Sequence, residues 1–464
     1  MKKATWISEV FEGRVELGEI RVRGWVRSVR KKKAFSFMVI NDGSSQKNLQ
    51  IVLDADINNY EALSSCLAGS CVEVEGELVE SQGKSQSFEV VAKTGVVLGS
   101  SKEDYPLQKK ATSMEFLREN AHFRPRTNLF GAVFRIRNTL AYATHRFFQE
   151  RGFYYLNTPI ITGIDAEGAG EMFNVSTLSP DKVKKLDNGE FDYKKDYFGK
   201  STSLTVSGQL EAETFAMGMG RVYTFGPTFR SENSNTARHL AEFWMIEPEV
   251  AFAELEDVAE LGADYIKYLI NSALNECLDD LLFLEKRDEV DAGLVERLKA
   301  VGSSEFTKIT YTEAVSILKE SGAKFEYPVE WGKELQTEHE RYLSEVKFSG
   351  PVIVTDYPKD CKAFYMKQNE DGKTVRAMDI LLPGVGEIIG GSQREEDLDK
   401  LKNRMEEMGM DQSSLWWYLD LRKHGTAPHA GFGLGFERAI MYITGMKNIR
   451  DVIAFPRTPK SADF

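Results

Sequence analysis

The stretch Gly431-Phe-Gly-Leu-Gly-Phe-Glu-Arg438 runs into a predicted helix near the end of this 464-residue sequence. Its alternating glycines do not form the GxGxxG pattern of a dinucleotide-binding fold, because position 436 is Phe. Gly199-Lys-Ser201 is not a phosphate-binding P-loop either, since Lys194 stands where that loop needs its first glycine. The sequence therefore predicts neither of these two common nucleotide-binding folds.

A second segment combines a charged motif with a strand-like run. It reads Phe229-Arg-Ser-Glu232, then a polar loop, then His239-Leu-Ala-Glu-Phe-Trp-Met-Ile-Glu247. The donors of a guanidinium form a planar fork, which suits an arginine in such a motif to hold a carboxylate and a phosphate together. The residue types therefore fit chemistry at a phosphate group.

A third segment precedes both of these in the chain. Apolar residues at helical spacing predict a helix over Asn128–Arg151, and Gly152 is a natural end for it. An extended run, Phe153–Ile161, follows and contains Pro159. The sequence thus predicts a long helix joined by a tight turn to an extended segment.

The first hundred residues predict a small β-barrel. Apolar and basic residues alternate over Ile20–Arg27, which puts an apolar face inward and a basic face outward. Four further strands and one short helix are predicted at residues 34–40, 49–53, 58–67 (the helix), 71–79 and 88–97. Five strands with a helix between the third and the fourth match the OB fold, which binds single-stranded oligonucleotides on one face. A barrel that binds no nucleic acid is the alternative.

Charge is distributed unevenly along the chain. The net charge of −12 argues against a nucleic-acid partner, yet residues 1–100 carry 13 basic and 13 acidic side chains. Seven basic residues and no acidic one lie within Arg21–Lys33. Because the local field is what meets a phosphate backbone, the barrel is the part of the chain that we expect to bind nucleic acid.

Neither a membrane segment nor a secretory signal is predicted. No apolar run reaches the roughly 18 residues that span a bilayer, and the amino-terminal residues lack the apolar core of a signal peptide. The four cysteines form no CxxC pair and fit free thiols in a reducing compartment. We therefore expect a cytoplasmic protein without membrane contact and without structural zinc.

In chain order the three segments resemble motifs 1, 2 and 3 of the class II aminoacyl-tRNA synthetases. With the barrel, the resemblance covers nearly the whole chain and narrows to the subclass for aspartate, asparagine and lysine. It implies an α+β protein with an OB-fold anticodon-binding domain at 1–100, a hinge at 101–125, and a class II catalytic domain at 126–464, an antiparallel sheet flanked by helices. It also implies a homodimer whose interface is motif 1, Asn128–Ile161, with Pro159.

This family joins an amino acid to ATP, so the resemblance implies an ATP site. Arg230 would hold the substrate carboxylate and the α-phosphate, Arg438 the γ-phosphate and one face of adenine, and Phe243 the other face. The positions implied for the site are Arg230, Glu232, His239, Glu242, Phe243, Glu387 and Arg438, of which Arg230, Glu387 and Arg438 are the implied catalytic residues. Asp379 and Glu387 would bind Mg²⁺, which prefers oxygen ligands. Two solvated turn carboxylates are the alternative for this pair.

The choice of amino acid rests on two short segments. Gly390-Gly-Ser-Gln-Arg394 resembles the strand whose arginine grips the substrate side chain in aspartate and asparagine enzymes. In Ser207-Gly-Gln-Leu-Glu-Ala-Glu213, Ala212 stands where aspartate enzymes place a lysine for the substrate carboxylate. A cavity with one arginine, no lysine and an added carboxylate disfavours a negative side chain, whereas a carboxamide can donate to a glutamate. The positions implied for this cavity are Glu167, Ser207, Gln209, Ala212, Glu247 and Arg394. Which glutamate reads the carboxamide stays open.

Three barrel residues are implied to contact the anticodon. Phe37 would stack on a base, Gln50 would hydrogen-bond a base edge, and Arg27 would lie on the exposed basic face. Burial in the barrel core is the alternative for Phe37, because its alternation with Phe35 and Val39 fits burial equally well.

The expected reaction is the ATP-dependent attachment of asparagine to tRNA(Asn). A short aspartate enzyme of the archaeal type, discriminating or nondiscriminating, is the near alternative. The segment from about Glu254 to Val375 is too short for the large extra domain of bacterial aspartate enzymes. The distant alternatives are a non-catalytic RNA-binding paralogue and an ammonia-dependent asparagine synthetase, and the latter is disfavoured by the presence of the barrel.

Overall fold

A computed structural model describes residues 3–81, 83, 86–107, 112–166, 171–179, 185–187, 189, 191–234 and 236–464. The chain divides into two compact units, Met1–Arg135 and Ile136–Phe464. Within the described ranges no helix combines the length and the apolar character needed to cross a bilayer.

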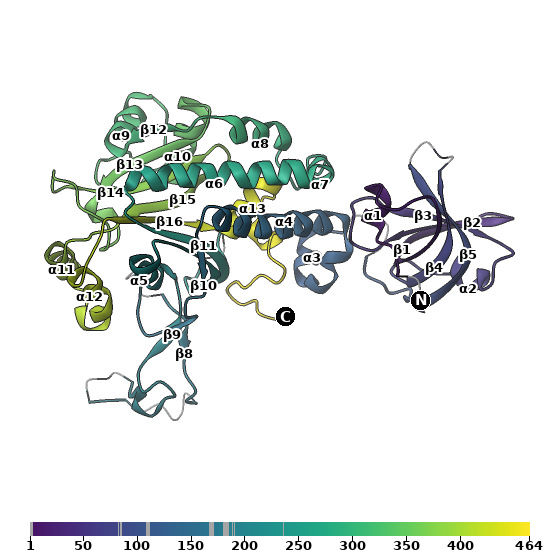
Figure 1. The fold of residues 1–464 in the computed structure, drawn as a ribbon, viewed down its shortest axis with the longest axis horizontal. Coiled ribbons are helices and arrows are strands. Elements are labelled where there is room, and N and C mark those ends of the chain that lie inside the picture. Colours follow the sequence, from purple (N-terminus) through teal and green to yellow (C-terminus); the bar gives the residue numbers. More distant parts are fainter. Residues whose placement is uncertain are drawn as a thin grey trace. The chain divides into compact units, whose positions relative to one another are not determined.

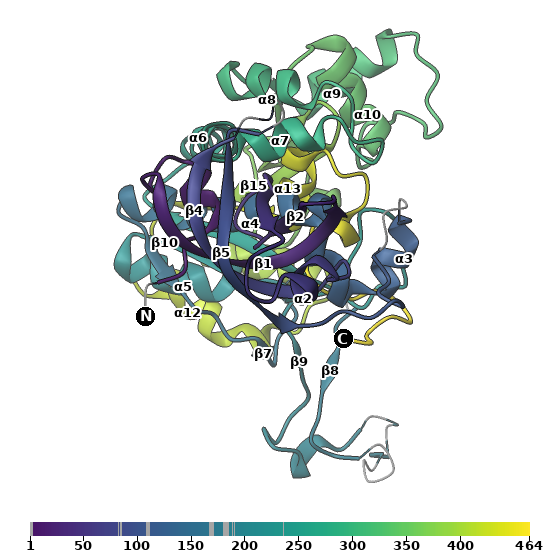
Figure 2. The ribbon, with the colours of Figure 1, turned by 90° about the vertical axis from the view of Figure 1, so that its right-hand side faces the viewer.

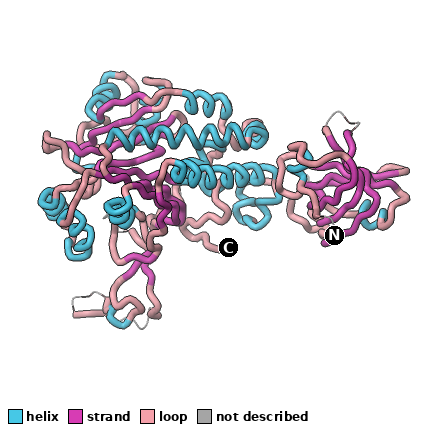
Figure 3. The backbone as a smooth tube through the Cα atoms, viewed as in Figure 1, coloured by secondary structure: helices cyan, strands magenta, loops and turns pink. Residues whose placement is uncertain are grey.

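The first unit contains a closed five-stranded barrel with the strand order β1-β2-β3-β5-β4 (Figures 1 and 3). Its elements are α1 (Ile7–Phe11), β1 (Gly18–Lys31), β2 (Phe35–Asn41), β3 (Leu49–Asp54), α2 (Tyr60–Ser64), β4 (Cys71–Glu80) and β5 (Phe88–Gly99). The predicted barrel and the helix between its third and fourth strands are confirmed. That helix is shorter than predicted, because it starts only after Asn59, whose φ of 66° is left-handed.

Alternation along the strands produces the barrel core. Ile20, Val22 and Val26 of β1 point inward and are at most 7% exposed, as the sequence predicts. Each fully buried aliphatic side chain of this kind stabilises the fold by about 1.5–3 kcal/mol. The segment after the barrel is not irregular, as the predicted hinge at 101–125 suggested. It contains α3 (Met114–Glu119) and a 3₁₀ helix (Ala121–Arg126).

The second unit is built on an eight-stranded sheet with the order β12-β13-β14-β15-β16-β11-β10-β6. Neighbouring strands are antiparallel except for the two outer pairs, β12–β13 and β10–β6, which are parallel. The strands are β6 (Tyr154–Leu156), β10 (Arg221–Phe229), β11 (Glu242–Ala251), β12 (Thr307–Thr310), β13 (Val352–Pro358), β14 (Thr374–Leu382), β15 (Gly386–Gln393) and β16 (His429–Gly435). The predicted antiparallel sheet is confirmed.

Long helices cover one face of this sheet. α6 (Leu255–Glu276) contacts β14, β15 and β16, and Figure 1 shows it running alongside α4 (Asn128–Glu150). A Cβ added to Gly262 of α6 would lie 3.0 Å from Ile380 Cδ1, so the helix packs closely on the strands. The hydroxyls of Thr144 and Tyr265 share a hydrogen bond of 2.8 Å between α4 and α6. The predicted helix over 128–151 is confirmed and ends before Gly152, whose φ is 78°.

The opposite face of the sheet has few side chains at its centre. Gly431, Gly433 and Gly435 alternate along β16, and Gly433 pairs with Gly390 of β15. A β-bulge in β15 reverses its alternation and places Glu387 on the same face as Gly390. We call these four glycines the glycine floor, since none of them has a side chain that would cover the backbone on this face.

The other elements surround this sheet. A small sheet of β7 (Ile161–Thr162), β9 (Thr202–Leu204) and β8 (Asn174–Val175) projects from it (Figures 1 and 2). Of the predicted insert at 181–200, residues 181–184, 188 and 190 lie outside the described residues. The remaining helices are α5 (Gln209–Met219), α7 (Leu278–Leu284), α8 (Leu294–Ser303), α9 (Tyr311–Glu320), α10 (Thr337–Arg341), α11 (Leu398–Glu407), α12 (Trp416–Lys423) and α13 (Phe436–Thr444).

Candidate active site

Six of the seven residues expected at the ATP site surround one cavity of about 450 Å³. Gly433 and Gly435 of the glycine floor form part of its lining. The expected residues that line it are Arg230, Glu232, His239, Phe243, Glu387 and Arg438. Glu242 is the exception, because it begins β11 opposite Phe229 of β10 and does not line the cavity.

Cationic and aromatic groups meet in this cavity. The Arg230 guanidinium lies 5.5 Å from the centre of the Phe243 ring. Arg438 Nη1 donates to the backbone carbonyl of Glu387 at 3.3 Å. Burial raises the pKa of the Glu387 carboxyl and the charge of Asp379 adds to this, whereas Arg438 and Arg230 oppose it. A ligand with several anionic oxygens would therefore meet two guanidinium groups beside a planar ring.

A second charged cluster borders Glu387. Lys362 Nζ donates to both carboxylate oxygens of Asp379, at 2.9 and 3.1 Å. A Cβ added to Gly390 would lie 3.1 Å from a Glu387 oxygen and 3.5 Å from an Asp379 oxygen, so both carboxylates face one point of the glycine floor. Glu340 of α10 accepts the Glu387 backbone N–H at 3.1 Å, and burial raises the pKa of the Glu340 carboxyl to about 7.

This donor set fits Mg²⁺. The ion is usually bound through one or two carboxylates, with phosphate oxygens and waters completing its shell. Asp379 and Glu387 supply two carboxylates, and burial makes the negative charge of Glu387 costly in the absence of a further cation. In the described part of the chain, no group of three His, Cys, Asp or Glu side chains could hold a metal ion.

A buried charge network lies where β15 ends and β16 begins. Arg394 donates to Glu249 of β11 through Nη2 at 2.5 Å and through Nε at 3.2 Å. Arg422 Nη2 of α12 donates to Glu213 of α5 at 2.7 Å. His429 Nε2 lies 2.8 Å from the same Glu213 oxygen. Because Arg394 also approaches Glu213 at 3.9 Å, the two ion pairs form one network, the recognition network below.

The recognition network contains more charge than the sequence predicted. We expected one guanidinium and one added carboxylate, whereas the structure has two of each, all nearly or fully buried. Burial raises the pKa of the Glu249 carboxyl, which the two hydrogen bonds from Arg394 oppose. The formal charges of the two arginines and two glutamates cancel. Each guanidinium already faces a carboxylate, so a preference of this site for an uncharged side chain stays a prediction.

Two of the residues expected to bind the amino-acid substrate lie on different sides of α5. Gln209 Nε2 donates to Glu213 Oε1 at 3.1 Å, since residues four apart lie on the same side of a helix. Ala212 instead packs against Ala216 and Val222 in a small apolar cluster. The predicted contact of Ala212 with the substrate cavity is therefore wrong, because its side of α5 faces β10.

Ser207 and Glu247 meet at the start of α5. The Ser207 hydroxyl donates to one Glu247 oxygen, and the Gly208 N–H and the Thr224 hydroxyl each donate to the other at 3.0 Å. Glu247 thereby fastens α5 to β10 and β11, and it borders a cavity of about 330 Å³. Glu167, the remaining residue expected here, lies outside the described residues.

A methyl group on Gly431 is expected to disturb the recognition network. An added Cβ would lie 2.2 Å from a Glu249 carboxylate oxygen and 2.4 Å from the Pro248 carbonyl. We expect Gly431→Ala to lower the free energy of unfolding by about 1–3 kcal/mol in urea titrations, because the site is overpacked. Gly435→Ala is the matched control, since its Cβ would meet its nearest atoms at 3.8 and 3.9 Å. Equal losses in both variants would contradict the prediction.

Phe37 lies on the outer face of the barrel. Its neighbours Met38 and Ser36 are fully buried while Phe37 is half-buried, so the alternative that placed it in the core is wrong. The Arg30 guanidinium lies 5.7 Å from the centre of the Phe37 ring. Gln50 of β3 shares this face and donates to Glu89 at 2.9 Å.

Part of the predicted basic face is neutralised within the barrel. Arg21 is paired with Glu75 of β4, and Arg23 with Glu73 of the same strand at 2.6 Å. The exposed basic residues beyond these pairs lie at the end of β1 and in the turn before β2: Arg30, Lys31, Lys32 and Lys33. The basic patch therefore adjoins Phe37 instead of covering the length of β1.

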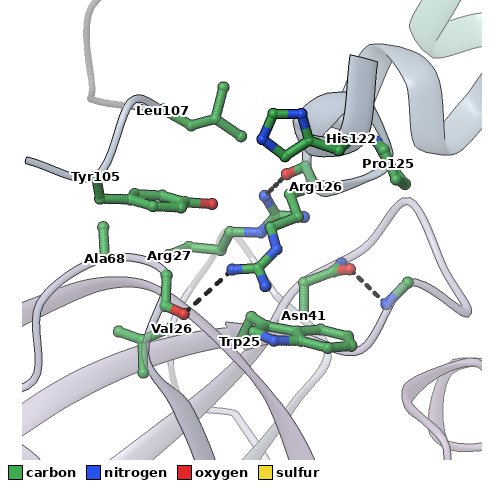
Figure 4. Close-up of a pocket in the computed structure, with 12 residues that line it drawn as sticks. Trp25, Val26, Arg27, Asn41, Ala68, Tyr105, Leu107, His122, Pro125 and Arg126 are labelled. Carbon is green, nitrogen blue, oxygen red and sulfur yellow. Dashed lines mark hydrogen bonds between the residues drawn. The ribbon is translucent and has the colours of Figure 1, made fainter. Parts of the chain in front are cut away.

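Arg27 is not part of this exposed patch. A β-bulge makes it the extra residue of β1, and its guanidinium donates to the backbone carbonyl of Arg126 (Figure 4). Burial lowers the pKa of Arg27. The surrounding cavity of about 330 Å³ holds the Arg126 guanidinium 5.6 and 5.9 Å from the ring centres of Trp25 and Tyr105. The predicted exposure of Arg27 is therefore wrong, since it binds the segment after the barrel.

Comparison with known proteins relates both parts of the chain to described families. A family described as tRNA synthetases class II (D, K and N) matches residues 113–459, and an OB-fold nucleic acid binding domain matches residues 20–98. The asparagine–tRNA ligases of Alkaliphilus metalliredigens and Porphyromonas gingivalis are 59% and 55% identical, over 96% and 100% of this chain and 96% and 99% of theirs. The chain belongs to the asparagine–tRNA ligases. The crystal structure of asparaginyl-tRNA synthetase from Pyrococcus horikoshii with asparaginyl-adenylate is 32% identical, with a TM-score of 0.86 over 100% of both chains.

Membership in the asparagine–tRNA ligases decides among the alternatives left by the sequence. The alternative of a short aspartate enzyme is excluded, because ligases named for asparagine match nearly the full length of the chain. An asparagine synthetase that lacks the barrel falls away too, since residues 20–98 match the OB fold. A non-catalytic paralogue usually loses part of its ATP site, whereas here six of the expected residues line one cavity.

Several charged and polar residues of this ligase were not predicted from the sequence. They are Glu249, Glu340, Lys362, Tyr418, Arg422 and His429, each in contact with an expected site residue or its partner. The one available signal was chemical, because a buried arginine such as Arg394 requires a counter-charge. That signal predicts that a partner exists without naming the residue.

Proposed function

We propose that this chain attaches asparagine to tRNA(Asn) in an ATP-dependent reaction with asparaginyl-adenylate as the intermediate. The observation that carries the proposal is the recognition network, which is buried and formally neutral around Arg394 and Glu213. The bulge in β15 puts Glu387, at the cavity expected to take ATP, on the same face as Gly390. One face of the sheet thus offers a phosphate site and a side-chain site.

The proposed chemistry has two steps. A carboxylate oxygen of asparagine bonds to the α-phosphorus of ATP while the bond to pyrophosphate breaks, and a ribose hydroxyl at the tRNA 3′ end then attacks the carbonyl carbon and displaces AMP. Arg230 would bridge carboxylate and α-phosphate, Arg438 would hold the γ-phosphate, and Phe243 would stack on adenine. Such catalysis relies on positioning and charge stabilisation. Mg²⁺ held by Asp379 and Glu387 would neutralise phosphate charge when bound.

Recognition of the side chain would divide between two residues. Arg394 is suited to donate to the carboxamide oxygen, and Glu213 to accept from the carboxamide NH₂. Gln209, which is expected to contact the substrate, donates to Glu213 Oε1. This contact supports Glu213 as the glutamate that binds the substrate carboxamide. An aspartate side chain would bring a second carboxylate against Glu213, at the cost of burying like charges together.

Pyrophosphate exchange into ATP tests the proposal. We expect exchange with asparagine to exceed exchange with aspartate by on the order of a hundredfold or more, because a site built for a hydrogen-bond donor rejects an analogue without it. The assay measures labelled ATP formed at matched amino-acid concentrations. Exchange driven by aspartate and not by asparagine would overturn the proposal, and exchange with neither would favour the non-catalytic paralogue.

The barrel would bind the anticodon through its outer face. Base stacking on Phe37 would contribute about 1–3 kcal/mol, so Phe37→Ala should weaken tRNA(Asn) binding by roughly 5- to 150-fold. Val96→Ala is the control, because Val96 is an apolar side chain of β5 that is 43% exposed. Filter binding or fluorescence anisotropy gives both affinities. If the two variants bind tRNA equally well, Phe37 does not stack on a base.

We further propose a homodimer in the cytoplasm. Exposed apolar side chains within the expected motif 1 interface support the dimer, among them Tyr142, Tyr154 and Ile160 at 65%, 56% and 44% exposure. All four cysteines are free, which fits a reducing compartment. Sedimentation velocity of the purified protein tests the dimer, and a monomer at micromolar concentration would exclude it.

A further inference from the structure

Glu213 has an unusually complete set of partners for a buried carboxylate. Oε2 accepts from Arg422 Nη2 at 2.7 Å, and the Tyr418 hydroxyl lies 2.8 Å from it and 3.0 Å from Oε1. His429 Nε2 is 2.8 Å from Oε2, and Gln209 donates to Oε1. Since Tyr418 has one proton to share between both oxygens, Oε1 keeps capacity for a further donor.

We propose that Arg422 is a positioning residue for amide selection: it holds Glu213 ionised and oriented, so that Glu213 accepts a carboxamide N–H and repels a carboxylate. The inference rests on the proposed function, in which Glu213 reads the side-chain amide. Arg422 itself need not touch the substrate.

The geometry favours Arg422 over the other partners for this role. Arg394 is committed to Glu249 at 2.5 Å and reaches Glu213 only at 3.9 Å. Tyr418 is neutral, and the charge of His429 depends on pH. Arg422 therefore supplies the permanent positive charge in direct contact with Glu213.

Arg422 is also rigidly placed. Its Nε donates to the backbone carbonyl of Glu395 at 3.0 Å, and its guanidinium lies 3.9 Å from the centre of the Tyr418 ring. Its side chain is fully buried, as is that of Glu213. A guanidinium fixed by a backbone carbonyl and a ring cannot rotate away from the carboxylate without breaking these contacts. Arg422 therefore fixes the orientation of the Glu213 carboxylate and also keeps it ionised.

The charge of Glu213 depends on this contact. Burial alone would raise the pKa of the Glu213 carboxyl, but Arg422, His429 and Arg394 together hold that pKa well below its usual range. The charged and titratable groups that face Glu213 come from α12, from β16 and from the end of β15, with Glu249 of β11 beyond Arg394: Arg422, Tyr418, His429, Arg394 and Glu249. Without Arg422, burial is opposed by less positive charge, so the pKa rises and protonation becomes accessible.

The test compares amino-acid selection in the full-length protein. For Arg422→Met we expect the asparagine-to-aspartate ratio of kcat/KM in pyrophosphate exchange to fall by roughly tenfold or more. The fall should be larger at pH 6 than at pH 8, since a protonated Glu213 can donate to a carboxylate. The change should appear mainly in KM for the two amino acids and not in KM for ATP. Arg422→Lys keeps the charge and should restore most of the ratio.

Two further variants keep the inference testable if Arg422→Met folds poorly. Glu213→Gln removes the charge directly and should lower the asparagine-to-aspartate ratio of kcat/KM by the same factor at every pH. Arg404→Met removes another buried arginine, paired with Glu407 at 2.9 Å in α11, and controls for lost stability. Binding of asparagine and aspartate by calorimetry gives the same comparison without turnover.

The outcomes separate this inference from the proposed function. If the parent protein selects asparagine and soluble Arg422→Met keeps the parental ratio at both pH values, Arg422 has no positioning role. The inference also fails if Arg404→Met relaxes the ratio equally. If the parent protein does not use asparagine, the proposed function itself fails, independently of Arg422.

Discussion

Arg230→Ala is expected to lower the rate of pyrophosphate exchange by about a hundred- to a thousandfold while leaving the protein folded. Arg230 follows the end of β10 and lines the cavity expected to take ATP, where its guanidinium sits against Phe243. If it bridges the substrate carboxylate and the α-phosphate, its removal takes away the group that aligns attacking and attacked atoms. Exchange at saturating ATP and asparagine measures the loss.

An arginine at the start of β10 provides the control. Arg221 begins β10, is exposed and donates to a backbone carbonyl at 3.2 Å, away from the residues that line the cavity. Arg221→Ala should exchange pyrophosphate within about twofold of the parent, because surface substitutions usually have small effects. Circular dichroism establishes that both variants are folded. An Arg230→Ala protein that exchanges as fast as Arg221→Ala would remove Arg230 from the catalytic step.

The barrel was predictable because each strand repeats its pattern locally. Alternation over Ile20–Arg27 predicts which side of β1 is buried, and burial follows that pattern up to Val26. For β2 the phase was ambiguous, because Ser36 is polar yet fully buried and shares a hydrogen bond with Tyr60 at 2.9 Å. Because a polar residue occupies the core face of β2, the sequence pattern fits Phe37 equally well on the inner and the outer face of the barrel. Its position could be decided only by the closed barrel.

β-Bulges set a second limit on prediction. One bulge turns Arg27 toward the segment after the barrel, and another brings Glu387 onto the glycine floor. Each inserts a single residue, so a strict period of two assigns the residues beyond it to the wrong face. Neither bulge is marked by a distinctive residue in the sequence. The strict alternation therefore placed Arg27 wrongly on the exposed face, and the expected role of Glu387 rested mainly on the resemblance.

The recognition network lay beyond sequence reasoning because its members are distant in the chain. Glu213 and Arg422 are 209 residues apart, and Arg394 and Glu249 are 145 apart. They come from α5, α12, β11 and the residue that follows β15, which meet only after the sheet has formed. By contrast, the residues of the cavity expected to take ATP lie in short motifs, one running from the end of β10 into β11 and the others on β15 and α13, which is why so many of them were predicted together.

The same network predicts where the fold is most sensitive to the loss of one charge. Arg394→Met should lower the free energy of unfolding by about 3–5 kcal/mol, because it leaves the buried carboxylate of Glu249 without its partner. The side chains of Arg394 and Glu249 are 3% and 0% exposed and lie 2.5 Å apart. Arg146→Met is the matched control, since Arg146 and Glu276 form a surface pair at 2.7 Å, and its loss should cost less than about 1 kcal/mol.

A double substitution separates the loss of the charge pair from the loss of packing. Replacing both partners, as in Glu249→Gln with Arg394→Met, removes the uncompensated charge. The free energy of unfolding of the double variant should therefore exceed that of Arg394→Met by on the order of 1–3 kcal/mol. Urea unfolding of the parent, both single variants and the double variant gives the coupling energy. If Arg394→Met costs no more than Arg146→Met, or if the double variant is the sum of its parts, Glu249 is not held ionised by Arg394. The formal neutrality on which the choice of asparagine rests would then be lost.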